Sequence, residues 1–153
     1  MRAPQYLKLF AVVLVAGGLL AGCATSGIKY TDVVASVPKL KRGQGRIYFY
    51  RTVAPGLAVQ PEIKVNGVAV GPTLPGGFFY VDRPAGTYEL VATTEIEEKI
   101  TVTLAAGETK YVRTFISPGL FVGHFNFDVV GREKAEADLE QLQQTGVSEG
   151  KPK

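Results

Sequence analysis

Residues 61–71 read PEIKVNGVAVG and place two short runs of β-forming residues on either side of Asn66-Gly67. An Asn-Gly pair is favoured in a type I′ turn, because both central positions of that turn need a positive φ. The twist of this turn matches that of two antiparallel strands, so the stretch predicts a hairpin of Glu62–Val65 and Val68–Val70. An antiparallel sheet is therefore the starting point for the rest of the chain.

Other short strands are predicted on both sides of this hairpin. Each is rich in aromatic or β-branched residues, and all but 87–94 end at a turn signal that contains Gly, usually with Pro or Ala. Seven or eight strands spaced about 8 to 12 residues apart, with no helical repeat between them, are typical of an antiparallel β-sandwich. We expect an all-β domain over residues 45–131, with further strands at 46–53, 78–82, 87–94, 99–104, 109–116 and 120–130.

The segments that flank this domain have different patterns. Residues 132–143 (REKAEADLEQLQ) are strong helix formers with Ala135, Leu139 and Leu142 on one stripe. We expect a short helix there that covers an edge or an end of the sandwich, because uncovered edges invite aggregation. Residues 144–153 are predicted to be a disordered tail. Residues 23–44 lack periodicity and are predicted to be a flexible tether, along which 30–37 could dock on the domain.

The first 22 residues have the features of a secretory signal peptide. Arg2 and Lys8 supply a positive start, and Leu9–Leu20 is an apolar or glycine run of 12 residues. Such a run is too short to span a bilayer, which needs about 20 residues, but it suits the apolar region of a signal peptide. Residues 1–22 are therefore expected to be removed.

Cys23 is the only cysteine of the chain, so no intramolecular disulfide can form. It follows Leu20-Ala21-Gly22, and this stretch resembles a lipobox, the recognition element of bacterial prolipoprotein processing. The resemblance implies cleavage between Gly22 and Cys23, thioether lipidation of Cys23 and acylation of the new amine, for example with palmitate. Two acyl chains already anchor a protein stably. Residue 24 is Ala rather than Asp, which in Gram-negative bacteria with enteric-type sorting implies the periplasmic face of the outer membrane.

The charge of the chain argues against nucleic-acid binding. There are 17 basic and 14 acidic residues, and removal of Arg2 and Lys8 leaves 15 against 14. A nucleic-acid-binding domain needs a clustered basic face. The group of residues most similar to such a face is Lys39, Lys41 and Arg42, with Arg46 shortly after. We interpret these as solvated charges on the tether.

Catalytic motifs are missing from the sequence. His124 is the only histidine, and no Gly-x-Ser-x-Gly, phosphate-binding loop or His-Glu-x-x-His occurs. We therefore expect neither an enzyme nor a cofactor.

Two clusters raise the question of a metal. His124, Asn126 and Asp128 alternate along one predicted strand, so they share a face and could act as ligands. The alternative, which we favour, is an ordinary solvent-facing side opposite an aromatic core side. Glu95, Glu97 and Glu98 crowd a hairpin tip, but their spacing fits no known calcium loop, and a solvated turn is preferred.

Two aromatic triplets, Tyr48-Phe49-Tyr50 and Phe78-Phe79-Tyr80, do not fit a simple sandwich. Alternation along a strand directs at least one aromatic residue of each triplet to the outer face of its sheet. Either Tyr30, Val33 or the C-terminal helix covers that face, or an exposed patch recognises a partner. The residues of the possible partner surface are Tyr48, Tyr50 and Phe79, and the arginines that could brace it by pairing with Asp82 or Asp128 are Arg51, Arg83 and Arg113.

The order of motifs resembles a family of proteobacterial lipoproteins catalogued as a domain of unknown function, family 2846. The resemblance covers roughly residues 43–130 and rests on GRIYFYR (45–51), PEIKVNGVAVG (61–71), GFFYVD (77–82), PAGTYE (84–89) and GETKYVR (107–113). The Pro-x-Gly-x-Tyr element followed by Ala-Gly-Glu is also similar to PEGA-type modules, which are small transthyretin-like β-sandwiches of the envelope. Those modules are non-enzymatic where their role is understood, so the resemblance implies a fold and a location but no activity.

Together these observations favour a membrane-anchored envelope lipoprotein whose non-catalytic β-sandwich binds a protein or glycan partner or contributes structure. The alternative is an accessory or inhibitor lipoprotein that docks on an envelope enzyme, transporter or secretion complex.

Overall fold

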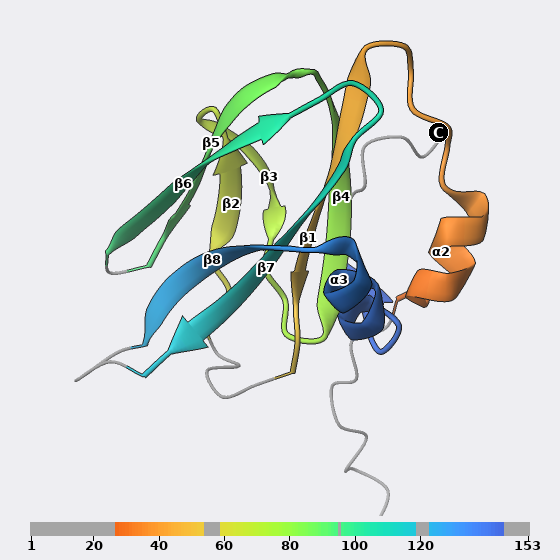
Figure 1. Ribbon diagram of the computed structural model, residues 1–153. Helices are drawn as coiled ribbons and strands as arrows, with labels where there is room; N and C mark the ends of the chain where they lie inside the picture. The colour runs from red at the N-terminus through yellow and green to blue at the C-terminus, as the bar shows by residue number, and fades with distance from the viewer. Residues whose placement is uncertain (1–26, 54–58, 95, 119–122, 146–153) are drawn as a thin grey trace, which may run out of the picture.

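Two β-sheets packed face to face, with two helices on the outside of one of them, make up the protein (Figure 1). The computed structural model describes residues 27–53, 59–94, 96–118 and 123–145, so Cys23 and the expected signal peptide lie outside the described residues. The helices are α2 (Tyr30–Ser36) and α3 (Arg132–Leu139). The strands are β1 (Gln44–Arg51), β2 (Glu62–Val65), β3 (Val68–Pro72), β4 (Gly77–Pro84), β5 (Gly86–Thr93), β6 (Glu97–Leu104), β7 (Thr109–Ser117), β8 (His124–Val130) and β9 (Gln143–Gln144).

The strand order confirms a β-sandwich and adds two parallel pairs to the antiparallel arrangement. One sheet has the order β8-β7-β1-β4-β9 and the other β3-β2-β5-β6. All neighbours are antiparallel except β1 with β7 and β4 with β9. A parallel pair needs a long crossover connection. The chain makes that crossover by building β4 and the whole four-stranded sheet between β1 and β7.

The Asn66-Gly67 hairpin forms as predicted. Asn66 and Gly67 have φ values of 48° and 80°, which are the positive angles that a type I′ turn needs. The turn is also fixed to the neighbouring strand, because the Asn66 side-chain Oδ1 accepts a hydrogen bond of 2.8 Å from the Glu89 backbone N–H.

Aliphatic and phenylalanine side chains fill the space between the two sheets. Ile47 and Phe49 of β1 point into this inner core, where Phe49 stacks on Phe79 with 5.2 Å between ring centroids. Burying each such side chain contributes about 1.5–3 kcal/mol. The other inner-core residues are Ile63, Val65, Val81, Leu90, Val102, Leu104 and Val112.

A second, tyrosine-rich core lies between the five-stranded sheet and the helices, which form a third layer. Tyr48 and Tyr50 alternate with the inner-core residues of β1, so β1 is buried on both faces. A strand buried on both faces reads as a continuous apolar run, which accounts for the aromatic triplets. The helices contribute Tyr30, Val33, Ala135 and Leu139, the segment after α3 contributes Leu142, and the sheet adds Phe78, Tyr80 and Tyr111.

The ends of the domain differ from the expectation. The structure describes the predicted tether from Gly27 onward, and this part is folded rather than flexible. Tyr30 and Val33 of α2 are buried against the sheet. The C-terminal helix ends at Leu139 rather than at residue 143. The predicted tail begins too early, because Gln144 is part of β9 and the Thr145 N–H donates to the Phe78 carbonyl at 2.8 Å. Within the described residues no helix has the length and apolar character needed to cross a membrane.

Candidate functional site

A hollow of about 200 Å³ lies between α2, α3 and the five-stranded sheet, and we name it the inter-helix hollow. Its floor comes from β1 and β7, which lie side by side in parallel register with Tyr48 opposite Tyr111. Its walls come from the two helices that cover this face of the sheet (Figure 1). The lining residues are Tyr30, Val34, Val37, Arg46, Tyr48, Thr109, Tyr111, Arg132 and Glu136.

Three tyrosines give the hollow its shape. Tyr48 and Tyr111 stack with 5.5 Å between ring centroids and 11° between their planes, and Tyr30 packs edge-on against Tyr48. The Tyr111 hydroxyl donates to Glu136 Oε1 at 3.2 Å. Burial raises the pKa of Tyr111 to about 12, and it raises the pKa of Tyr30 and Tyr48 as well. These phenols therefore stay protonated at neutral pH.

Arg46 places a fixed cation beside the tyrosines. Its Nε and Nη2 donate to the two carboxylate oxygens of Asp82 at 2.6 and 2.7 Å, and Nη2 also donates to the Pro38 carbonyl at 2.9 Å. The guanidinium carbon lies 4.3 Å from the centroid of the Tyr80 ring. Burial lowers the pKa of Arg46, but the hydrogen bonds and charge of Asp82 outweigh this effect, so the pKa is raised overall.

The chemistry of the hollow is suited to binding. Its floor and walls present the edges of three tyrosines that are at most 8 % exposed, and its rim is formed by Arg132 and Glu136, whose Nη1 and Oε1 atoms are 3.5 Å apart. Small-molecule sites usually measure about 300–1,000 Å³, so this hollow matches a single side chain or sugar ring.

Comparison with known proteins identifies the family. The family model described as "Protein of unknown function (DUF2846)" matches residues 41–125, more than half of the chain. The chain belongs to DUF2846.

A protein of Haemophilus influenzae is similar to this DUF2846 protein. It is described as an uncharacterized protein, and the two are 23 % identical over 141 residues, which cover 88 % of this chain and 84 % of the relative. No solved structure matches the chain. The family match spans β1 to the start of β8, so it contains the inner core but not β9, nor α2 and α3, which form the walls of the inter-helix hollow.

The partner surface expected on this DUF2846 protein is wrong. Tyr48, Tyr50 and Phe79 are 4 %, 2 % and 2 % exposed. The first two lie under the helices, where the Tyr50 hydroxyl donates to Asp138 Oδ2 at 2.9 Å, and Phe79 belongs to the inner core. The alternative, that Tyr30, Val33 and the C-terminal helix cover the outer face, is the correct one.

The candidate metal ligands of β8 alternate along the strand as predicted, but other groups already engage two of them. Asp128 Oδ2 accepts from Arg113 Nη2 at 2.6 Å, and Asn126 Nδ2 donates to Ser117 Oγ at 2.9 Å. Within the described residues no group of three His, Cys, Asp or Glu side chains is arranged to hold a metal. His124 and Asn126 instead line a second hollow of about 320 Å³, together with Ile96, Glu98, Ser117 and Phe125.

The acidic hairpin tip shows one ion pair. Lys99 Nζ lies 3.6 Å from Glu97 Oε1, and both side chains are more than half exposed. Glu95 lies outside the described residues. The described part of the tip is thus a solvated turn, as we expected.

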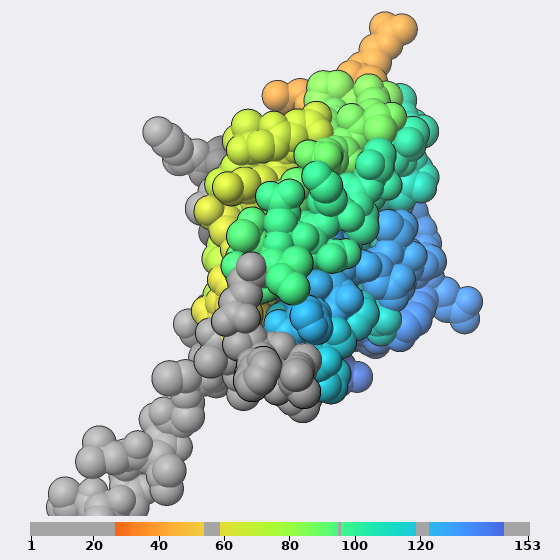
Figure 2. All heavy atoms as spheres, turned by 90° about the vertical axis from the view of Figure 1, so that its left-hand side faces the viewer, coloured from red at the N-terminus to blue at the C-terminus, as the bar shows by residue number. Residues whose placement is uncertain are grey.

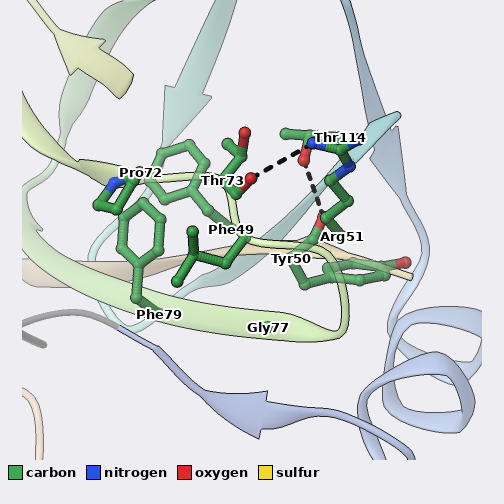
Figure 3. Close-up of a pocket in the computed structure, with 9 residues that line it drawn as sticks. Phe49, Tyr50, Arg51, Pro72, Thr73, Gly77, Phe79 and Thr114 are labelled. Atoms are coloured by element: carbon green, nitrogen blue, oxygen red, sulfur yellow. Dashed lines mark hydrogen bonds between the residues drawn. The ribbon is translucent and has the colours of Figure 1, made fainter. Parts of the chain in front are cut away.

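Arg51 is a buried cation that braces the end of β1. Its side chain is 2 % exposed, and Nη1 donates to the carbonyls of Val59 and Thr73, the latter at 3.3 Å (Figure 3). The surrounding crevice has no room for a water molecule. Burial lowers the pKa of Arg51. The role of this arginine is structural.

The predicted arginine pairs are found in part, and the most buried pair was missed. Arg113 pairs with Asp128, as anticipated, while Arg83 Nη1 donates to the backbone carbonyl of Asp82 at 3.0 Å. The missed pair is Arg46 with Asp82, because we placed Arg46 at the start of a predicted strand but grouped its charge with the solvated charges of the tether. The available signal was the position of Arg46 at the start of an aromatic strand, where a side chain can be covered by neighbouring elements.

Proposed function

We propose that this protein is a lipid-anchored module of the bacterial envelope, held at the periplasmic face of the outer membrane by acyl chains on Cys23. The observation that carries this proposal is Cys23 itself, the single cysteine of the chain, which completes Leu-Ala-Gly-Cys after the apolar run 9–20. Its sulfur would be consumed in a thioether, which explains why a protein of an oxidising compartment carries one unpaired cysteine.

A binding or structural role suits the domain better than catalysis. The ionisable groups around the inter-helix hollow already have partners: Arg46 with Asp82, Tyr111 with Glu136, and Arg132 with Glu136. A general base must be free to accept a proton from a substrate. We assign the hollow to recognition of an envelope partner, either a protein side chain or a sugar ring.

Fatty-acid labelling tests the anchor. Cells that express the full chain are grown with an alkyne analogue of palmitate, and the purified protein is checked for incorporation. We expect labelling of the wild type and of the control Thr25→Ala, and none of Cys23→Ser. The wild type should remain with the membranes after a high-salt wash. Equal labelling of Cys23→Ser and wild type would contradict the proposal.

A charge-reversal pair tests the role of the hollow. Arg132→Glu changes its rim, whereas Lys134→Glu makes the same charge change on α3 at a residue that does not line it. After crosslinking in intact cells, a partner at the hollow should be lost with Arg132→Glu and kept with Lys134→Glu. A peptidoglycan pull-down with the same variants tests a glycan partner. The accessory alternative predicts a stoichiometric protein whose activity changes when this protein is deleted.

A further inference from the structure

The folded domain begins very close to Cys23. The Gly27 N–H donates to Gln143 Oε1 at 2.9 Å, the Gln144 N–H donates to the Ile28 carbonyl at 2.8 Å, and Lys29 forms a β-bridge with Gln143. A Cβ built on Gly27 would lie 2.2 Å from the Gln144 carbonyl oxygen, so the backbones are in close contact. The chain is therefore fixed to the sheet from residue 27.

Only residues 24–26 separate Cys23 from this attachment. Four Cα–Cα steps span at most about 14 Å. The polar headgroup layer of a bilayer takes up about 5–7 Å of that length. A lipidated Cys23 would therefore hold Gly27 within several ångströms of the membrane surface, and not at the end of a long tether.

The strand register shows which end of the sandwich this is. Gln143 pairs with Gly77, and Gly77 pairs with Arg51, so Gly27 lies at the end where β1 finishes. β7 runs parallel to β1, so Ser117 and the start of β8 lie there too. The tip of the β5–β6 hairpin joins them, because Ile96 lines the second hollow with Ser117. We call this the anchor end; it is the lower end in Figure 1.

Three of the six exposed large apolar side chains among the described residues lie at the anchor end. Val53 is 73 % exposed, Ile96 58 % and Ile28 48 %. The basic loop with Lys39, Lys41 and Arg42 precedes β1 and so lies at the opposite end, where the orange segment projects at the top of Figure 2. The contact with the membrane would thus depend on the short connection and on apolar groups rather than on a polybasic patch.

From these observations we propose that the anchor end of the sandwich rests on the surface of the bilayer that holds the acyl chains of Cys23. The proposal rests on the lipidation proposed above. The second hollow then faces the headgroups, whereas the inter-helix hollow stays open to the periplasm, because Arg46 and Thr109 on its floor lie near the starts of β1 and β7.

Site-specific fluorescence quenching tests this orientation. In the lipidated protein the sulfur of Cys23 is in a thioether, so an introduced cysteine is the only free thiol. Val53→Cys places a thiol at the anchor end, and Ala106→Cys places one on an exposed turn at the opposite end. Each full-length protein is purified from membranes, labelled with a fluorophore and reconstituted in phosphatidylcholine vesicles that contain a nitroxide-headgroup lipid.

We expect both variants to float with the vesicles and the Val53→Cys label to be quenched roughly threefold more, because a strand of eight residues separates the two ends by about 26 Å. Flotation with equal quenching, or with stronger quenching at Ala106→Cys, would overturn the orientation and leave the lipid anchor standing. Failure to float would overturn the anchor, and the orientation with it.

A linker variant checks the length argument. A flexible 12-residue Gly/Ser insertion between Ser26 and Gly27, made in Val53→Cys, adds a reach of about 19 Å. Quenching of the Val53→Cys label should then fall to the value seen at Ala106→Cys. Unchanged quenching would show that the short connection does not hold the domain on the surface, and would overturn that part of the proposal.

Discussion

Arg46 and Asp82 face each other across β1 and β4 and form a two-pronged ion pair, with Nε 2.6 Å from Oδ1 and Nη2 2.7 Å from Oδ2. The Arg46 side chain is 7 % exposed, and the guanidinium also binds the Pro38 carbonyl and the Tyr80 ring. The pair therefore joins the segment that follows α2 to the centre of the five-stranded sheet, beside the inter-helix hollow.

Loss of one member of this pair should be strongly destabilising. Asp82→Asn leaves the Arg46 charge buried without its counter-charge, and we expect the free energy of unfolding to fall by about 3 kcal/mol. Asp128→Asn is the matched control, because its pair with Arg113 is much more exposed and should contribute less than about 1 kcal/mol. Urea denaturation of both variants measures the difference. Equal losses in the free energy of unfolding would show that the buried Arg46–Asp82 pair stabilises the fold no more than the exposed Arg113–Asp128 pair.

The hydrogen bond from Tyr50 to Asp138 should attach α3 to the sheet. Tyr50→Phe removes the hydroxyl and keeps the ring, so we expect a loss of about 1.5–3 kcal/mol, typical of a hydrogen bond to a charged group. A double-mutant cycle with Asp138→Ala isolates the pairwise term. A coupling energy near zero would argue against this bond.

The tyrosine core predicts a loss of stability at high pH. Burial raises the pKa of Tyr30, Tyr48, Tyr50, Tyr80 and Tyr111, the last to about 12, whereas unfolded tyrosines titrate near 10. Above pH 10 the unfolded chain binds fewer protons than the folded one, so the free energy of unfolding falls as pH rises. The contribution of Tyr111 to the free energy of unfolding should be complete below pH 10 and lost by about pH 12.

Tyrosinate absorbance and circular dichroism, followed together in an alkaline titration, measure this effect. We expect the buried tyrosines to ionise together with unfolding. Ionisation near pH 10 in a protein that stays folded would contradict a sealed tyrosine core.

The packing of α3 is testable with a cavity. Leu139 is fully buried in the tyrosine-rich core, so Leu139→Ala should cost about 3 kcal/mol. Val129→Ala removes an apolar side chain that is about half exposed and should change stability by less than about 0.5 kcal/mol. Thermal or urea unfolding compares the two. A small effect of Leu139→Ala would mean that the helix does not seal this face.

The sequence predicts those parts of the fold that local rules determine. The Asn66-Gly67 turn could be predicted because it needs two positive φ angles. Ala135 and Leu139 could be predicted as the buried side of a helix from their spacing, whereas Leu142 is buried after the helix has ended. The parallel pairing of β1 with β7 was not readable, since it joins strands far apart in the chain. The docking of residues 27–30 on residues 142–144 leaves no signal either, because two of its three hydrogen bonds join backbone groups.

The candidate site was predicted less well for a related reason. Periodicity correctly directed Tyr48 and Tyr50 to the outer face of their sheet, but it could not show that α2 and α3 bury them. Arg46 was read as a solvated charge because its counter-charge, Asp82, comes from a different strand.

The most direct measurement is the mass of the N-terminal peptide of the protein extracted from membranes. We expect a peptide that begins at Cys23 and carries a diacylglyceryl group, with or without a third acyl chain on the amine. A peptide that still contains residues before Cys23, or an unmodified Cys23, would contradict a lipid anchor at this residue.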